Sequence, residues 1–560
     1  MTGYRPLPIG IEDFKELVMK NYYFVDKTLM IKELIDIKSK VTLFTRPRRF
    51  GKTLNMSMLR RYFEKSPEDN AVLFDGLDIL YAGEEYRKYM GKYPVISISL
   101  KSMKQPSYEK AFWQFKDIII DEFCRHDYVL KSDKLKPVQK KRFEDIYNDT
   151  ADDSAYDSAL KLLSDCVSQC CEENVVILID EYDVPLENAY FCGFYDEMVG
   201  LVRSVFEKAL KTNSSLEFSV LTGCLCISKE SIFTGFNNMN IFSVNDVKFS
   251  EYSGFTENEV VKFLKAYGLE EKFEEIKRWY DGYIFGETEI YNPWSVLKYI
   301  QSVYFNRKAL PEPYWSNTSS NSIIHELVAM SGNDVKKSVE LIVNGGSVDK
   351  PLYESITYSD IQVNAECIWS FLLHTGYLKP IKKYKSGNKT YFTGVIPNIE
   401  VLIIYEDTIR HWFDEKIKTS DKSKLLQAVL ENDAETFELE VNRWLLRSIS
   451  YHDGYENFYH GFLTGLLEYS DEYLVISNRE SGTGRSDIII KNVLTRDKAI
   501  IIEVKSSDNE RALETSCDTA LRQINEKHYD TELIADGYKN ILKYGIAFCQ
   551  KRCHVKSATD

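Results

Sequence analysis

The sequence has no long apolar run, no framework of regularly spaced cysteines and no excess of positive charge. Its longest apolar stretches, such as VVILI and AIIIEV, are far shorter than the 18 or more residues of a membrane-spanning helix. Acidic residues near the N-terminus stand where a signal peptide needs an apolar run, and eleven irregularly spaced cysteines suit reduced thiols. We therefore expect a cytoplasmic protein that binds no membrane.

Acidic residues outnumber basic ones, and one segment forms a local basic-aromatic patch. The 85 acidic residues outnumber the 71 basic ones and give a net charge of -14, which disfavours adhesion to nucleic acid through bulk charge. One segment combines lysine with tyrosine: Lys379, Lys382, Lys383, Lys385 and Lys389, with Tyr377, Tyr384 and Tyr391. This patch suits contact with a nucleic-acid backbone, or else it is an ordinary solvated hairpin.

The chain length indicates several domains. A chain of 560 residues exceeds what one hydrophobic core normally organises, so we expect about three domains. Residues 1–250 alternate helical stretches with the apolar runs KVTLFT, YPVISISL, VVILID, LEFSVLTG and IFSVNDVKF. Strands of continuous Val, Ile and Leu separated by amphipathic helices indicate a parallel sheet covered on both faces. The first domain is therefore predicted to be α/β.

The strand signals fade after residue 250 and return near the C-terminus. Thr256 is a predicted helix N-cap, and Glu259 completes a capping box. A helix ending at Gly376 and two short strands joined at residues 386–388 resemble a winged-helix module, so residues 251–425 are predicted to form a helical lid and a winged-helix-like region. Residues 426–560 alternate strand and helix signals, which predicts a second α/β domain.

A strand at residues 41–45 leads directly into the loop RPRRFGKT, residues 46–53, and a helical stretch follows. In a phosphate-binding loop, backbone N–H groups surround a phosphate, the lysine reaches the β- and γ-phosphates, and Ser or Thr holds Mg²⁺. Gly51, Lys52 and Thr53 fit this pattern, whereas Arg46 replaces its first glycine. We predict an ATP site that includes Arg46, Arg48, Arg49, Gly51, Lys52, Thr53, Asp180 and Thr222.

The strand VVILI ends in the acidic pair Asp180 and Glu181. A buried strand that delivers two carboxylates at its C-terminal end suits Mg²⁺ binding and water activation. We expect Asp180 to hold Mg²⁺ together with Thr53, and Glu181 to act as the catalytic carboxylate. Thr222, at the end of the strand LEFSVLTG, is placed to sense the γ-phosphate. The plainer alternative is a core strand ending in a solvated acidic turn.

Near the C-terminus, Asp487 and Glu503 each lie eight residues from Thr495. A hairpin centred on Thr495 sets the two carboxylates opposite each other, and alternation places Lys505 on the same face. Two opposed carboxylates repel unless a cation lies between them, and Mg²⁺ or Mn²⁺ prefers such oxygen ligands. Asp487, Glu503 and Lys505 are therefore candidate catalytic residues for phosphodiester hydrolysis. The alternative is an edge strand with solvated charge.

Several long motifs carry a family resemblance: RPRRFGKT, LIDEYDVPL, TGCLCISKESIFTGFNN, WYDGYIFGETEIYNPWSVL and FYHGFLTGLL. They resemble the bacterial AAA-ATPase-like family whose members carry a C-terminal PD-(D/E)XK nuclease-like domain. The Arg at position 46 agrees with that family. Cys226 departs from it, because members commonly have Arg there, and this puts ATP turnover in doubt if that Arg senses phosphate.

The resemblance implies a P-loop ATPase followed by a C-terminal domain with a restriction-endonuclease-like fold. It also implies that Glu456 joins the metal ligands Asp487 and Glu503, with Gln523 and Tyr529 on the following helix. Arg485 is a candidate phosphate contact or a solvated surface residue, and we interpret His460 as a structural partner rather than a ligand.

Together these features predict an ATP-dependent switch coupled to a nuclease that uses Mg²⁺ or Mn²⁺. ATP and nucleic acid, DNA or RNA, are the expected partners, with a homo-oligomer as a further option. A role in genome defence or mobile-element biology fits this architecture. The alternative is a regulatory NTPase whose nuclease-like domain only binds nucleic acid or protein.

Overall fold

The computed structural model describes residues 5–227, 232–233, 239–315, 333–418, 423–447, 456–467, 473–481, 484–492, 495–507, 509–549 and 552–559. The chain forms two compact units: an N-terminal unit of residues 1–320 and 345–403, and a C-terminal unit of residues 321–344 and 404–560. The expected domain boundaries near residues 250 and 425 stay a prediction. Within the described ranges, no helix is both long and apolar enough to cross a membrane.

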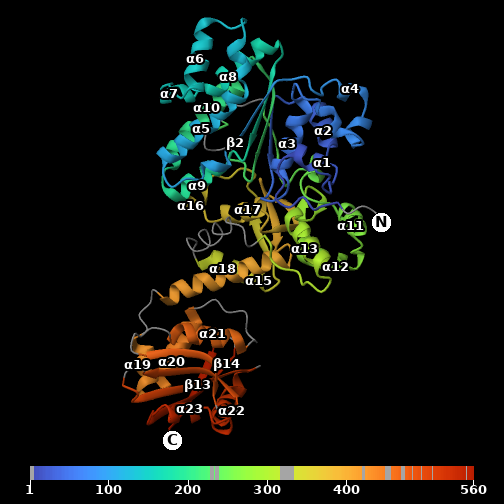
Figure 1. Ribbon diagram of the computed structural model, residues 1–560. Coiled ribbons are helices and arrows are strands. Elements are labelled where there is room, and N and C mark those ends of the chain that lie inside the picture. Colours follow the sequence, from blue (N-terminus) through green and yellow to red (C-terminus); the bar gives the residue numbers. More distant parts are fainter. Residues whose placement is uncertain are drawn as a thin grey trace. The chain divides into compact units, whose positions relative to one another are not determined.

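A five-stranded parallel sheet forms the centre of the N-terminal unit (Figure 1). In spatial order its strands are β2 (Val95–Ser99), β3 (Val175–Asp180), β4 (Leu216–Gly223), β1 (Val41–Thr45) and β5 (Met239–Phe242). Every residue of β1 and β3 is buried, as expected for strands covered on both faces. The parallel α/β sheet predicted from the sequence is confirmed.

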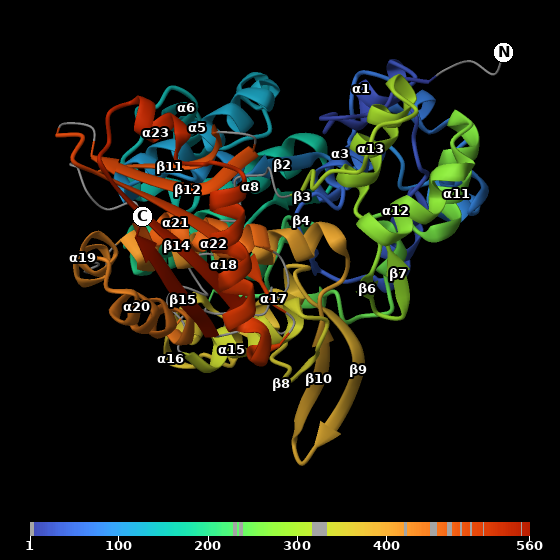
Figure 2. The same ribbon diagram turned by 90° about the horizontal axis from the view of Figure 1, so that it is seen from below.

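Helices cover both faces of this sheet (Figures 1 and 2). One side carries α1 (Phe14–Met19), α2 (Leu29–Ile37), α3 (Lys52–Phe63) and α4 (Glu84–Arg87). The other side carries α5 (Tyr108–Arg125), α6 (Pro137–Tyr147), α7 (Asp153–Tyr156), α8 (Ala159–Cys171), α9 (Val184–Cys192) and α10 (Tyr195–Phe206). Leu59 and Phe63 of α3 share a buried cluster with Val176 and Val220, which anchors the helix that follows the loop.

Strand order brings the predicted nucleotide-binding segments together. Strand β4 lies between β1 and β3, so that Thr222 is in register with Phe44 of β1. The carboxyl ends of parallel strands meet at one edge of the sheet, where ligands bind in open α/β folds. The strand expected through residues 241–249 ends at Phe242, because the backbone N–H and hydroxyl of Ser243 donate to Asp246 and turn the chain.

The helical part of the N-terminal unit follows the sheet. It contains α11 (Glu257–Tyr267), α12 (Phe273–Tyr280), β6 (Tyr283–Phe285), β7 (Thr288–Ile290) and α13 (Pro293–Phe305). The predicted capping box is confirmed: the N–H of Thr256 donates to Glu259 Oε2 at 2.8 Å, and the N–H of Glu259 donates to Thr256 Oγ1 at 3.4 Å. This reciprocal pair fixes the start of α11.

A three-stranded antiparallel sheet completes the N-terminal unit, with the order β8-β10-β9. Its strands are β8 (Val348–Pro351), β9 (Lys379–Ser386) and β10 (Lys389–Val395), and the helices α16 (Tyr358–Val363) and α17 (Cys367–His374) lie between β8 and β9 in the chain. Gly376, with φ +87°, allows the sharp exit from α17 into β9. The helix and hairpin expected here are present. The winged-helix assignment itself stays a prediction.

The C-terminal unit is built on a mixed sheet of order β11-β12-β13-β14-β15. These strands are β11 (Tyr473–Ser481), β12 (Gly484–Asn492), β13 (Lys498–Ser506), β14 (Asn540–Cys549) and β15 (Arg552–Thr559). Its helices are α15 (Asn333–Val343), α19 (Ser423–Glu431), α20 (Ala434–Arg447), α21 (Glu456–Leu467), α22 (Leu513–Glu526) and α23 (Thr531–Ala535), and α18 (Ile399–Lys418) passes from one unit into the other. Among the described strands of this sheet, β13 and β14 alone pair in parallel, across the connection that contains α22 and α23.

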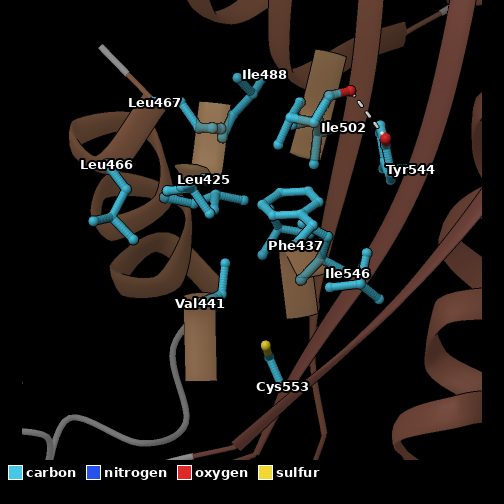
Figure 3. Packing of buried hydrophobic residues seen from close by; sticks show 14 of the residues in the cluster. Leu425, Phe437, Val441, Leu466, Leu467, Ile488, Ile502, Tyr544, Ile546 and Cys553 are labelled. Carbon is cyan, nitrogen blue, oxygen red and sulfur yellow. Dashed lines mark hydrogen bonds between the residues drawn. The ribbon is translucent and has the colours of Figure 1, made fainter. Parts of the chain in front are cut away.

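The core of the C-terminal unit fixes which side chains of the β12–β13 hairpin face which helix. Ile488 and Ile502 pack with Leu425 and Phe437 in the cluster shown in Figure 3. Ile489 and Ile501 belong instead to a second buried cluster, which contains Ile524 of α22 and Tyr529. Since side chains alternate along a strand, Asp487, Glu503 and Lys505 lie on the α22 face.

Candidate functional sites

The loop between β1 and α3 has the backbone geometry of a ligand-binding turn. Gly51 has φ +82° and Arg49 has φ +69°, so that two residues of the loop adopt left-handed conformations. A side chain at position 51 would be strained, which explains the glycine there. Helix α3 begins at Lys52, and its first backbone N–H groups have no partner within the helix, as at any helix N-terminus.

Lys52 is buried and holds the loop together. Its Nζ donates to the carbonyl oxygens of Arg46 and Pro47, both at 2.9 Å, and lies 3.7 Å from Cys224 Sγ. The ammonium group therefore sits inside the loop, and Thr53 follows it on the wall of a cavity. This arrangement places the predicted lysine and hydroxyl beside one another.

The acidic end of β3 lies next to β4. Asp180 Oδ1 accepts a hydrogen bond from the Thr222 hydroxyl, while the buried Oδ2 atom has no hydrogen-bond partner among the described residues. Glu181 has φ +55°, its N–H donates to Thr222 Oγ1 at 3.3 Å, and burial raises the pKa of its carboxyl. An unpartnered buried carboxylate oxygen on Asp180 fits a hard cation such as Mg²⁺.

Asp183 is a further buried carboxylate that the sequence reasoning did not single out. Its Oδ2 accepts from the backbone N–H groups of Cys224 (2.7 Å) and Leu225 (3.0 Å), and burial raises its pKa. These bonds fix the loop that follows β4. The acidic run LIDEYD could have drawn attention to Asp183, but the sequence alone does not show which of its carboxylates binds the loop after β4.

The three loop arginines have different surroundings. Arg46, expected to contact the nucleotide, is fully buried: its guanidinium donates to the carbonyls of Thr45, Phe242 and Phe249, and burial lowers its pKa to about 10. It is not among the residues that line the cavity, so its side chain supports the loop from the core. Arg48 and Arg49 do line the cavity.

Arg48 and Arg49 have partners that the sequence did not reveal. Arg48 forms an ion pair with Glu187 of α9 at 2.6 Å. The guanidinium carbon of Arg49 lies 4.5 Å from the centre of the Trp294 ring, at the start of α13. Both partners come from segments far away in the chain, so no local sequence pattern predicts them.

A cavity of about 420 Å³ opens beside the loop. Its cationic lining comprises Lys27, Arg48, Arg49, Lys52, Lys101 and Lys104, with Glu12 and Glu181 as acidic members. Its apolar and aromatic lining includes Ile11, Leu17, Tyr23, Phe24, Phe255, Phe263 and Trp294. Lys27, Arg48 and Lys101 already form ion pairs with acidic side chains. The cationic lining beside an aromatic wall suits a polyphosphate joined to a planar ring. The sequence reasoning missed the N-terminal segment, Lys101, Lys104 and Trp294.

Cys226 is buried in the loop after β4. Its carbonyl oxygen accepts from the N–H of Ile356 and the hydroxyl of Ser355, both at 3.3 Å. Cys226 does not line the cavity. These two bonds tie the loop after β4 to the segment that follows β8.

In the C-terminal unit, β12 and β13 have the register expected from the sequence. Ile488 is paired with Ile502 and Ile490 with Ile500, so the next step along the same ladder places Asp487 across from Glu503. Asp487 Oδ2 accepts from the N–H of Val504 at 2.8 Å. The two carboxylates therefore lie close together at the end of the hairpin ladder.

Glu503 is the most deeply buried of these charged groups, with 1% of its surface exposed. Its Oε1 accepts from Lys505 Nζ at 3.0 Å and from Gln523 Nε2, which also lies 3.1 Å from the Tyr529 hydroxyl. Oε2 is buried and has no hydrogen-bond partner within the described residues. Burial and the nearby Asp487 raise the pKa of Glu503 to about 7.

The donor set fits a hard divalent cation. Asp487 and Glu503 offer carboxylate oxygens, and Glu503 Oε2 remains for a further ligand. No group of three or more His, Cys, Asp or Glu side chains suited to a metal occurs among the described residues. Glu456, the expected additional ligand, begins α21, but its side chain lies outside the described part of the chain, as does that of Arg485.

His460 supports the site through the backbone. Its Nε2 lies 2.8 Å from the carbonyl oxygen of Asp487, which links α21 to the strand that carries the carboxylate. This contact agrees with the structural role expected for His460. It orients Asp487 without occupying its carboxylate.

Comparisons with known proteins match two parts of the chain to family models. Residues 8–233 match a family model described as a predicted AAA-ATPase, and residues 454–558 match the model of the PD-(D/E)XK nuclease superfamily. A protein of Azotobacter chroococcum mcd 1, described as an uncharacterized protein in the vnfD 5' region, is 25% identical over 401 residues, which cover 71% of this chain and 68% of the relative. The chain carries an AAA-ATPase-like domain near its N-terminus and a PD-(D/E)XK nuclease superfamily domain at its C-terminus.

Proposed function

We propose that the chain is an ATP-binding and ATP-hydrolysing switch coupled to a metal-dependent nuclease that hydrolyses nucleic-acid phosphodiesters. One shared feature carries this proposal. At each site, a lysine and two acidic residues meet at strand or loop ends, and a buried carboxylate oxygen, Asp180 Oδ2 or Glu503 Oε2, lacks a hydrogen-bond partner among the described residues. Such oxygens are costly to bury unless a ligand or cation compensates them.

At the N-terminal site, the backbone N–H groups at the start of α3 and the Lys52 ammonium bind the phosphates of ATP. Lys52 exchanges its bonds to the carbonyls of Arg46 and Pro47 for phosphate oxygens. Thr53 and Asp180 are the residues that would hold Mg²⁺, and the ion would neutralise phosphate charge. Glu181 accepts a proton from the attacking water, and Thr222 keeps Asp180 and Glu181 in place through its two hydrogen bonds.

At the C-terminal site, Asp487 and Glu503 are the residues that would hold Mg²⁺ or Mn²⁺. The bound ion supplies charge to polarise a phosphoryl oxygen and lowers the pKa of water. Lys505 keeps Glu503 oriented and neutralises charge that develops on the phosphate. Gln523 fixes the other contact of Glu503 Oε1. An ATP-controlled nuclease of this kind suits a cytoplasmic role in genome defence or mobile-element biology. We further propose that the chain associates with itself.

Two single substitutions test the two halves separately. Lys52→Ala should abolish ATP binding in a calorimetric titration, and Lys505→Ala should abolish Mn²⁺-dependent cleavage of DNA or RNA while leaving ATP binding unchanged. Lys110→Ala, on an exposed helical surface, is the matched control for both. Undiminished ATP affinity in Lys52→Ala would overturn the nucleotide site. Absence of cleavage by the unmodified protein would favour the alternative, in which the nuclease-like domain only binds its partner.

A further inference from the structure

The β9–β10 hairpin is a basic segment of an acidic protein. Residues 381–391 contain four lysines and no acidic residue, whereas the whole chain carries a net charge of -14. Lys382, Lys385 and Lys389 are exposed. Such a separation of charge concentrates positive potential on one projecting element and attracts polyanions.

The turn end of this hairpin extends beyond the third strand of its sheet. Strand β8 pairs with β10 from Tyr391 to Gly394, and the N–H of Leu352, just after β8, donates to the carbonyl oxygen of Thr390 at 2.8 Å. Beyond that bond, residues 385–389 form the projecting end of the two-stranded ribbon (Figure 2). From Lys385 to the turn at Gly387 and Asn388, the ribbon projects about 7 Å at the usual strand rise. The ribbon is therefore a narrow projection and not part of a broad surface.

Register places lysines on both faces of the ribbon. Lys389 pairs with Ser386 and Lys382 with Thr393, on the face that carries the Tyr384–Tyr391 pair. Lys385 pairs with Thr390 on the opposite face. The nearest acidic residue of the sheet, Asp349, accepts from the Thr393 hydroxyl at the base of the hairpin, so the positive charge increases toward the turn.

We propose that this ribbon binds double-stranded DNA by entering the major groove, with lysines from its two faces contacting the two phosphate backbones. The major groove of B-form DNA is about 12 Å wide and 8.5 Å deep, and it admits a two-stranded β-ribbon. The assignment rests on the proposed nuclease function and names its substrate class. Phosphate contacts by lysine fix the position of the protein on the duplex.

The same geometry disfavours the other nucleic acids. The major groove of duplex RNA is deep and narrow, so side chains do not enter it. Single strands are held by aromatic rings on which bases stack. Here the Tyr384 ring already stacks on Tyr391, with centroids 5.8 Å apart and planes 16° apart, and Lys382 Nζ lies 5.4 Å from its centre.

A binding experiment without cleavage tests this proposal. The full chain, kept in EDTA, is titrated into a fluorescent DNA duplex about three helical turns long, and anisotropy is measured over a range of salt. The triple variant Lys382→Ala, Lys385→Ala, Lys389→Ala should weaken binding at least tenfold and reduce the slope of log affinity against log salt by about 2 to 3. The matched control removes three exposed lysines elsewhere in the N-terminal unit: Lys110, Lys131 and Lys141. It should leave both quantities nearly unchanged.

Equal losses in the two triple variants, or no loss in the hairpin variant, would overturn the proposal. Single-stranded DNA, duplex RNA and phosphatidylserine vesicles serve as parallel probes. Binding to any of them that is as tight and as dependent on the hairpin would overturn the duplex-DNA assignment. The nuclease proposal fails separately: hairpin-dependent binding without Mn²⁺-dependent cleavage would refute only the nuclease, whereas cleavage with hairpin-independent binding would refute only the ribbon.

Discussion

The Thr222 hydroxyl donates a hydrogen bond to Asp180 Oδ1 and accepts one from the N–H of Glu181. One side chain on β4 thus fixes both carboxylates at the end of β3. The contact exists because β4 lies between β1 and β3 in the sheet. The other oxygen of Asp180, Oδ2, is buried and has no hydrogen-bond partner among the described residues.

Replacement of Thr222 tests this relationship. Thr222→Val keeps the shape and removes both hydrogen bonds, so ATP hydrolysis should fall about 10- to 100-fold, the usual effect of removing a group that orients a metal ligand. The free energy of unfolding should decrease by about 1–2 kcal/mol because Glu181 N–H loses its acceptor. Thr222→Ser retains the hydroxyl and should behave like the unmodified protein. Steady-state turnover and chemical denaturation provide the two measurements.

Glu181 should govern turnover and not affinity. Glu181→Gln should reduce kcat by about 10²-fold or more, since it removes a general base, while calorimetry shows ATP still bound. Because burial raises the pKa of Glu181 above its ordinary value, and the ionised form is the base, kcat of the unmodified protein should rise with pH through this raised pKa. A flat pH profile together with unchanged turnover in Glu181→Gln would contradict the role.

Asp487 combines a charge with a structural hydrogen bond, and two substitutions separate them. Asp487→Asn retains an oxygen that can accept from Val504 N–H, and it removes the repulsion with Glu503, so metal-free stability should stay the same or rise slightly. Asp487→Ala loses the bond and should cost about 1 kcal/mol. Both should abolish cleavage. Calorimetric melting in EDTA distinguishes them, and equal destabilisation by both would contradict the charge-relief argument.

Glu503 predicts a pH dependence of stability in the absence of metal. Its folded pKa of about 7 exceeds its unfolded pKa of about 4.5, so the folded state retains a proton that the unfolded state has lost. This contribution is fully present below pH about 4.5 and disappears as pH rises toward 7, a loss of about 3 kcal/mol. Glu503→Gln should remove this decline. The measurement is differential scanning calorimetry in EDTA from pH 5 to 8. The transition of the C-terminal unit is identified beforehand as the one whose melting temperature Mn²⁺ raises.

Comparison of the unmodified protein with Glu503→Gln also shows whether Mn²⁺ stabilises the protein by binding Glu503 or by binding elsewhere. If Mn²⁺ binds through Glu503, the increase in melting temperature that the ion causes should grow from pH 5 to pH 8 and level off above pH about 7, because Glu503 is then already ionised. Glu503→Gln should show no such increase. Equal stabilisation of both proteins by Mn²⁺ would place the ion elsewhere.

Local backbone rules made parts of the fold predictable from the sequence. The side-chain period of a strand is two residues, so the equal spacing of Asp487 and Glu503 about Thr495 was enough to predict their register. Continuous Val and Ile in β3 indicated a strand buried on both faces, and the capping box of Thr256 and Glu259 marked the start of α11. These features depend on neighbours a few residues apart.

Tertiary packing alone decided the surroundings of the sites. Arg46 directly follows β1 in the loop, yet its guanidinium lies in the core. It is held there because β5 and the turn after it bring the carbonyl oxygens of Phe242 and Phe249 within hydrogen-bond distance. Trp294 reaches Arg49 only through the packing of α13. Gln523 meets Glu503 because α22 packs on one face of the sheet. Sequence determined the period and polarity of each element, whereas contacts between distant elements depend on how buried surfaces fit together, which no local pattern encodes.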